Sequence, residues 1–129
     1  MTSVLFLCTE NACRSQIAEA FAHRHNPGHF KVYSSGSAPS GVVNPKAISS
    51  MKKVGYDLTA HTSKTVASLG PARFDVIVSM GCGDKCPELT ASHREDWGIH
   101  DPKHLDAKEF DGIRDNIESR VLELYQRLA

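Results

Sequence analysis

The chain has 129 residues, and its 15 lysine and arginine residues balance 15 aspartate and glutamate residues, so the formal net charge at pH 7 is zero. Because neither sign of charge forms a run, we expect no nucleic acid and no membrane surface as a partner, and a small ligand instead. The length fits one monomeric domain over residues 1–129, and the lack of a signal-peptide pattern or of an apolar stretch of ~20 residues predicts a cytoplasmic location.

Predicted strands and helices alternate in the first half of the chain. The stretch "SVLFLC" (3–8) has the pattern of a buried strand, and apolar residues at helical spacing after Arg14 predict a helix. The stretch "FKVYSSG" (30–36) predicts a second strand that ends at a glycine. Asn44, which is followed by a proline, predicts the N-cap of the next helix.

The second half continues this alternation. The stretch "RFDVIVSM" (73–80) is the clearest buried strand, and a polar stretch (93–102), in which no strand is predicted, separates it from a long amphipathic helix between Phe110 and Leu128. The whole pattern predicts the α/β class, with an open parallel β-sheet of about four strands and helices on both faces.

The four cysteines, at positions 8, 13, 82 and 86, form two clusters that are far apart in the sequence. Cysteines in a reducing compartment are more often catalytic, redox-active or metal-binding than disulfide-bonded. Ligands of open α/β sheets bind beyond the carboxyl ends of the strands. We therefore expect Cys8, the loop 81–86 and Asp101 to meet at that edge of the sheet.

Cys8 and Arg14 stand at the two ends of the loop between the first strand and the first helix. Backbone N–H groups of such a loop, together with the helix dipole, form a site for a tetrahedral oxyanion, and a guanidinium can grip two of its oxygens. The same groups favour a thiolate at Cys8, the candidate nucleophile. The candidate substrate-binding residues form the rest of the loop: Thr9, Glu10, Asn11, Ala12, Cys13, Arg14 and Ser15.

Three residues of this loop have more specific expectations. The Ser15 hydroxyl can donate to the thiolate. Asn11 tolerates left-handed backbone angles and can tie the loop together through its amide, so we expect a scaffolding role. Cys13 is either inert packing or an occasional oxidative partner of Cys8. The alternative for the whole motif is a buried cysteine that ends a strand and an arginine on a helix surface, and the strand-to-helix turn favours the catalytic interpretation.

With "VLFLCTENACRSQIAEAF" (4–21), the chain resembles the low-molecular-weight tyrosine-phosphatase superfamily, and within it the arsenate reductases of the thioredoxin-coupled type. The resemblance covers nearly the whole chain and continues in "YSSG", "GVVNPKAI", "HTSK", "GCGDKCP", "EDWGIHDP" and "IRDNIESRV". The phosphatases usually carry proline in place of Gln16. They also follow their Asp-Pro pair with tyrosines and lack this thiol loop.

The resemblance implies a role for each candidate catalytic residue. Cys8 attacks the arsenic of arsenate, Arg14 and the loop amides hold the oxyanion, and Asp101 protonates the oxygen that leaves as water. Cys82 then attacks the adduct and expels arsenite, and Cys86 attacks Cys82 to free Cys8. No bound cofactor is implied, and thioredoxin is the expected external reductant.

The thiol loop departs from the pattern of the family. The relay cysteines of thioredoxin-coupled members are farther apart, whereas a glutathione-linked subgroup has a similar "GCG" without the later cysteine, and relatives that use mycothiol rely on a single catalytic thiol. Because Cys86 is present, thioredoxin remains the first choice; glutathione or mycothiol with a redoxin is the alternative. A zinc site at Cys82 and Cys86 is a further alternative with weak ligand spacing.

Other functions remain open at this point. A low-molecular-weight protein tyrosine phosphatase is the main alternative activity, and a weak phosphatase side activity fits either case. A non-catalytic anion sensor is a further alternative, but it would need neither the relay thiols nor Asp101. The alternative for Asp101 alone is a turn residue, since Asp-Pro is common at bends.

The stretch "HTSK" bears on a cation site. Some relatives bind potassium near the anion loop through positions that correspond to Asn11, Glu19, Ser34 and Thr62, together with an acidic residue where this chain has Lys64. We expect the Lys64 ammonium to occupy the place of the cation. The alternative is an ordinary surface lysine.

Overall fold

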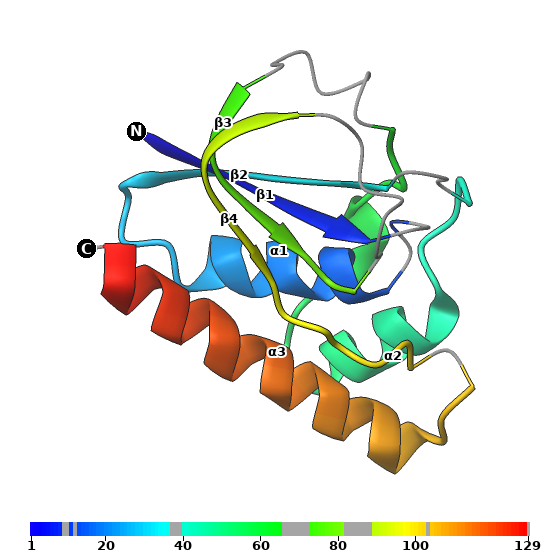
Figure 1. The fold of residues 1–129 in the computed structure, drawn as a ribbon. Coiled ribbons are helices and arrows are strands. Elements are labelled where there is room, and N and C mark those ends of the chain that lie inside the picture. The colour runs from blue at the N-terminus through cyan, green and yellow to red at the C-terminus, as the bar shows by residue number, and fades with distance from the viewer. Residues whose placement is uncertain are drawn as a thin grey trace.

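The computed structural model describes residues 1–8, 11, 13–36, 40–65, 73–81, 89–102 and 104–128 (Figure 1). Among these residues no helix combines the length and the apolar character that a membrane span requires.

Four parallel strands form one sheet in the order β2-β1-β3-β4. They are β1 (Thr2–Cys8), β2 (Phe30–Gly36), β3 (Arg73–Ser79) and β4 (Thr90–Asp96). The predicted parallel α/β sheet of about four strands is therefore confirmed. The carboxyl ends of the strands lie at one edge, since the last residue of β1 pairs with the last residue of β2.

The fourth strand was not located from the sequence. Its residues 93–96 fall in the polar stretch in which no strand was predicted. In the structure no residue of β4 is buried, and its side chains are mostly polar. Among the described strands, β4 lies at the edge of the sheet and pairs with β3 alone. A half-exposed edge strand shows little of the hydrophobic pattern on which sequence analysis depends.

The helices are α1 (Arg14–Arg24), α2 (Pro45–Lys52), the short 3-10 helix η1 (Leu58–Ala60) and α3 (Ala107–Leu128). The predicted cap of α2 is confirmed, because the Asn44 side chain accepts a backbone N–H bond from the first turn. Figure 1 shows α1 beneath the sheet, with α3 alongside it.

Both faces of the sheet are buried. The side chains of Val4, Phe6, Val76 and Val78 belong to one core cluster with residues of α1, α2 and α3. On the opposite face a second cluster contains Leu5, Leu7, Phe74 and Ile77, which are at most 1% exposed. The alternation of side chains along each strand explains why neighbouring residues enter different clusters.

Candidate active site

Cys8 is the last residue of β1, and α1 begins six residues later at Arg14, so the strand and the helix flank this segment as the sequence predicts. The Cys8 residue is only 2% exposed. Its sulfur lies 2.9 Å from Ser15 Oγ. This places the thiol at the carboxyl edge of the sheet and beside the first turn of α1.

Asn11 fixes the middle of the loop. Its φ of 51° lies in the left-handed region, which asparagine tolerates better than most residues. Its Nδ2 donates to Ser15 Oγ at 2.7 Å and to Ser34 Oγ at 3.1 Å, and its Oδ1 accepts the backbone N–H of Lys64 at 2.8 Å. These contacts are of the scaffolding kind expected for Asn11.

The same contacts orient the Ser15 hydroxyl. Asn11 donates to one lone pair of Ser15 Oγ, and the Ser15 hydroxyl is the donor to Cys8 Sγ when Cys8 is a thiolate, because a thiolate has no hydrogen to give. Ser15 is thus placed to donate to the sulfur of Cys8. A hydrogen bond of this direction suits a sulfur that acts as a nucleophile.

Arg14 is anchored to two other loops. Its Nη1 donates to the carbonyl oxygen of Met80 at 2.8 Å, at the end of β3, and to that of Ile99 at 2.9 Å, after β4. Within the described residues both anchors use Nη1, so Nε and Nη2 are available to an oxyanion. The guanidinium is therefore held in place before any ligand arrives.

The N-terminus of α1 adds further donors. Cys13 is the N-cap residue, and its side chain does not cap the helix. There is no acidic residue in the first turn. Backbone N–H groups at such a helix end attract an anion. Cys13 itself is buried, at 7% exposure.

The other predicted site residues divide into two groups. Asp101 is exposed and lies two residues after Ile99, whose carbonyl holds Arg14. Thr9, Glu10, Ala12, Cys82 and Cys86 lie outside the described residues. Gly81, which precedes Cys82, has a φ of +99°, and a Cβ built on it would lie 3.7 Å from Arg14 Nη1. Gly81, the residue before Cys82, therefore lies close to Arg14.

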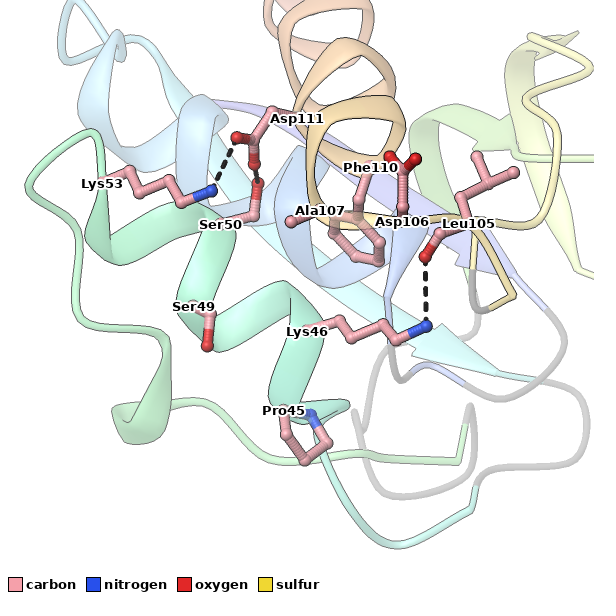
Figure 2. Close-up of a pocket in the computed structure, with 10 residues that line it drawn as sticks. All are labelled: Pro45, Lys46, Ser49, Ser50, Lys53, Leu105, Asp106, Ala107, Phe110 and Asp111. Atoms are coloured by element: carbon pink, nitrogen blue, oxygen red, sulfur yellow. Dashed lines mark hydrogen bonds and ion pairs between the residues drawn. The ribbon is translucent and has the colours of Figure 1, made fainter.

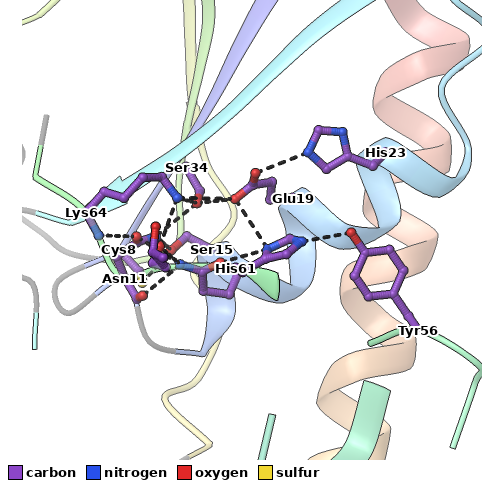
Figure 3. A network of polar contacts seen from close by, with 11 residues as sticks. Cys8, Asn11, Ser15, Glu19, His23, Ser34, Tyr56, His61 and Lys64 are labelled. Carbon is purple, nitrogen blue, oxygen red and sulfur yellow. Dashed lines mark hydrogen bonds and ion pairs between the residues drawn. The ribbon is translucent and has the colours of Figure 1, made fainter. Parts of the chain in front are cut away.

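The positions expected around a cation do meet in space (Figure 3). The Lys64 ammonium lies 2.9 Å from the carbonyl oxygen of Thr62, 3.4 Å from Ser34 Oγ and 3.7 Å from Glu19 Oε1. Asn11 reaches the same group through Ser34. Lys64 is therefore no isolated surface lysine, and its ammonium supplies the positive charge at this point.

Glu19 balances that charge. Burial raises the pKa of its carboxyl group, but the hydrogen bonds from His23 and Ser34 and the positive charge of Lys64 outweigh burial and lower the pKa to about 2. The Ser34 hydroxyl donates to Glu19 Oε1 at 2.5 Å, and His23 Nε2 lies 3.1 Å from Oε2. Glu19 is therefore ionised throughout the neutral range.

Gln16, His61 and Tyr56 were missed as site residues. The sequence identified Gln16 only as a family marker, yet its side-chain amide contacts Asn11 and is itself held by His61. His61 also contacts Tyr56 (Figure 3). No spacing signal was available, because Gln16 lies on α1 whereas His61 follows η1.

A metal site has no support in the described ranges. There, no three histidine, cysteine, aspartate or glutamate side chains are placed to share a metal ion. The zinc alternative concerns Cys82 and Cys86, which lie outside those ranges.

A pocket of about 350 Å³ lies between α2 and the start of α3 (Figure 2). Its two lysines already have partners: Lys46 Nζ donates to the carbonyl oxygen of Leu105 at 3.1 Å, and Lys53 Nζ donates to Asp111 at 2.8 Å. None of the described residues that line it belongs to the loop between β1 and α1.

The sequence and the fold are similar to those of known proteins. Residues 3–129 match the family model described as low molecular weight phosphotyrosine protein phosphatase. The arsenate reductase of Bacillus subtilis is 40% identical over 131 residues, which cover 93% of this chain and 92% of the relative. The glutaredoxin arsenate reductase of Synechocystis is 35% identical over 132 residues, with full coverage of both chains.

Two solved structures extend this comparison. An arsenate reductase in the phosphate binding state has a TM-score of 0.89 at 35% identity, and the match covers both chains completely. The thioredoxin-dependent arsenate reductase of Corynebacterium glutamicum has a TM-score of 0.78 at 28% identity, covering 98% of this chain and 61% of the other.

Proposed function

Since the chain belongs to the low molecular weight phosphotyrosine protein phosphatase family, and within it to the arsenate reductases, we propose that it reduces arsenate to arsenite with Cys8 as the nucleophile. The observation that carries this proposal is the contact between Cys8 Sγ and Ser15 Oγ at the N-terminus of α1, beside the anchored Arg14. Such an activity serves arsenical resistance.

The first step uses the anion loop. Arg14 and backbone N–H groups of the loop hold the oxygens of arsenate, and the Cys8 thiolate attacks arsenic. A sulfur–arsenic bond forms and an arsenic–oxygen bond breaks, and Asp101 supplies the proton with which that oxygen leaves as water. The exposure of Asp101 lets solvent protonate it again.

The second step transfers electrons. Cys82 attacks the sulfur of Cys8, the sulfur–arsenic bond breaks, and arsenic keeps the electron pair and leaves as arsenite. Cys8 and Cys82 are thereby oxidised to a disulfide. The position of Gly81 beside Arg14 supports this step, because Cys82 follows directly in the chain.

The third step carries the oxidation outward. Cys86 attacks Cys82, frees Cys8, and leaves a Cys82–Cys86 disulfide that thioredoxin reduces with two electrons. The thioredoxin-dependent neighbour favours this reductant, whereas the glutaredoxin-linked relative supports glutathione with a redoxin, and mycothiol is a third choice. The relay is complete within one chain, so we propose that the domain of residues 1–129 works as a monomer in the reducing cytoplasm.

Hydrolysis of a phosphate ester is the second candidate activity. Phosphate and arsenate share shape and charge, so the loop that holds one oxyanion suits the other, and the family model itself describes phosphatases. We propose this only as a weak side activity, since the relay cysteines have no use in hydrolysis.

A single-turnover experiment tests the proposed function. Reduced protein is mixed with arsenate in the absence of any reductant, arsenite is measured, and the disulfides are mapped by mass spectrometry. We expect about one arsenite per protein molecule and a disulfide between Cys82 and Cys86. Hydrolysis of an aryl phosphate without any arsenite would instead identify the protein as a phosphatase.

A further inference from the structure

The side-chain amide of Gln16 joins two segments behind the anion loop. Its Nε2 lies 3.0 Å from the backbone oxygen of Asn11, 2.9 Å from Asn11 Oδ1 and 2.8 Å from the backbone oxygen of Thr62. All three partners are acceptors, so the nitrogen of the amide must face them and Oε1 must face the other way. Gln16 thus fixes both the backbone and the side chain of Asn11, the loop residue with left-handed backbone geometry.

The opposite end of this amide determines the protonation of His61. Gln16 Oε1 lies 3.0 Å from His61 Nδ1, and Glu19 Oε1 lies 3.6 Å from the same nitrogen. Because both neighbours are acceptors, Nδ1 carries a hydrogen. Burial lowers the pKa of His61 despite the charge of Glu19, so the ring is neutral and Nε2 has a lone pair.

Tyr56 completes the arrangement. Its hydroxyl lies 2.8 Å from His61 Nε2 and therefore donates to it. The direction of donation runs from Tyr56 to His61, from His61 to Gln16, and from Gln16 to Asn11. The His61 side chain is only 9% exposed, so little water is available to replace these partners.

We propose that His61, supported by Tyr56, is a positioning residue for the oxyanion loop. It holds Gln16 in the single orientation that lets the amide nitrogen bind Asn11, and Asn11 in turn binds Ser15 beside Cys8. The inference rests on the proposed function, because the loop that His61 supports is the loop proposed to bind arsenate. Loss of the His61 donor frees the Gln16 amide to rotate and leaves Asn11 with weaker support.

Two substitutions at His61 separate positioning from packing. His61→Leu keeps bulk but has no donor for Gln16. His61→Asn is smaller, yet its amide nitrogen occupies a position equivalent to Nδ1 and can still donate. If His61 acted only by filling space, the asparagine would be the more harmful change.

Two binding measurements are needed, one of them independent of arsenate turnover. If phosphate binds in the loop, it should protect Cys8 from alkylation by iodoacetamide, and tandem mass spectrometry resolves Cys8 from Cys13. The phosphate concentration for half-protection then reports oxyanion affinity. The KM and kcat for arsenate are measured beside it. We expect His61→Leu to raise the half-protection concentration and the KM about fivefold or more, with a smaller change in kcat. His61→Asn keeps the donor to Gln16 but loses the contact with Tyr56, so we expect it to raise both values no more than about two- to threefold.

Tyr56→Phe has a matched control elsewhere in the chain. Tyr125 also donates a hydroxyl hydrogen bond, to the carbonyl oxygen of Ala22 at 2.7 Å near the far end of α1. We expect Tyr56→Phe to raise the KM and the half-protection concentration about two- to threefold. Tyr125→Phe should lower the melting temperature without changing either value. If His61→Leu does not fold, Tyr56→Phe decides the question, and its failure to change either value overturns the proposal.

The proposal is also overturned if His61→Leu binds phosphate as wild type does, or if His61→Asn is impaired as strongly as His61→Leu. Failure of the proposed function has a different signature. In that case wild-type protein releases no arsenite, while protection of Cys8 by phosphate still responds to the His61 variants.

Discussion

Lys64 Nζ lies 3.7 Å from Glu19 Oε1, and the pair is partly shielded from solvent, with side-chain exposures of 24% and 13%. The same ammonium bonds the carbonyl oxygen of Thr62. The ammonium thus lies among oxygen atoms of Ser34, Thr62 and Glu19, the positions that the resemblance associates with a bound cation.

Potassium should therefore have little effect on this protein. At equal ionic strength, replacing sodium with potassium should change the melting temperature by less than about 1 °C, because an ammonium already fills the site and repels a second cation. Lys64→Asp removes that ammonium and should create a potassium-specific rise in the melting temperature. A clear potassium effect on wild type would contradict this prediction.

Glu19 should make stability depend on pH. Its pKa falls from an ordinary value of 4.5 to about 2 on folding, which corresponds to about 3 kcal/mol of stability. A lowered pKa gives stability that is complete above the unfolded value and is lost as the pH falls through about 4.5 toward 2. In urea unfolding, Glu19→Gln should thus cost more at pH 7 than at pH 3.

The control for Glu19 is Glu118→Gln. Glu118 pairs with His25 at 2.8 Å and is 33% exposed in its side chain. This more exposed pair should contribute less than about 1 kcal/mol at neutral pH. Equal losses for both variants would argue against a special role of Glu19.

Cys8→Ser should abolish arsenate reduction and any phosphatase activity. A serine hydroxyl stays protonated where a thiolate is needed, so the rate should fall on the order of 10³-fold or more. Cys13→Ser leaves the nucleophile in place and should retain measurable turnover. Substantial arsenite formation by Cys8→Ser would contradict the proposed mechanism.

Arg14→Lys should reduce kcat/KM for arsenate about one hundredfold. One ammonium cannot bond the Met80 and Ile99 carbonyls and also grip two oxygens of an anion. Arg120→Lys, on α3, where the guanidinium bonds Asn116, is the control and should leave kinetics unchanged. Similar efficiency of wild type and Arg14→Lys would show that the guanidinium is not needed.

Cys82 and Cys86 should behave differently although they are four residues apart. Cys82→Ser should stall before arsenite release unless an external thiol replaces it. Cys86→Ser should release about one arsenite per molecule and stop as a Cys8–Cys82 disulfide, because no third thiol remains. Normal turnover of Cys86→Ser with thioredoxin would exclude the three-thiol relay. Turnover only with a low-molecular-weight thiol and its redoxin would favour the glutathione or mycothiol route.

Local sequence patterns predict the parts of the molecule that depend on local physics. The structure contains the apolar strands β1 and β3, the Asn44 cap, the end of β1 at Cys8 and the start of α1 at Arg14. The Met80 and Ile99 carbonyls that hold Arg14 could not be predicted, because every residue has a backbone carbonyl and the sequence does not show which one accepts a side-chain hydrogen bond. Likewise, the partnership of Gln16 with His61 depends on packing that brings distant segments together.

The mostly polar side chains of β4, because of which the strand was not predicted from the sequence, also affect how the sheet edge meets other molecules. A strand at the margin of a sheet offers unpaired backbone donors and acceptors to any other chain, and an apolar one would promote aggregation. The exposed side chains of His93, Arg94 and Asp96 put charged or ionisable groups along this margin. The residues that obscure the strand in the sequence thereby discourage intermolecular sheet growth and help to keep a concentrated protein dispersed.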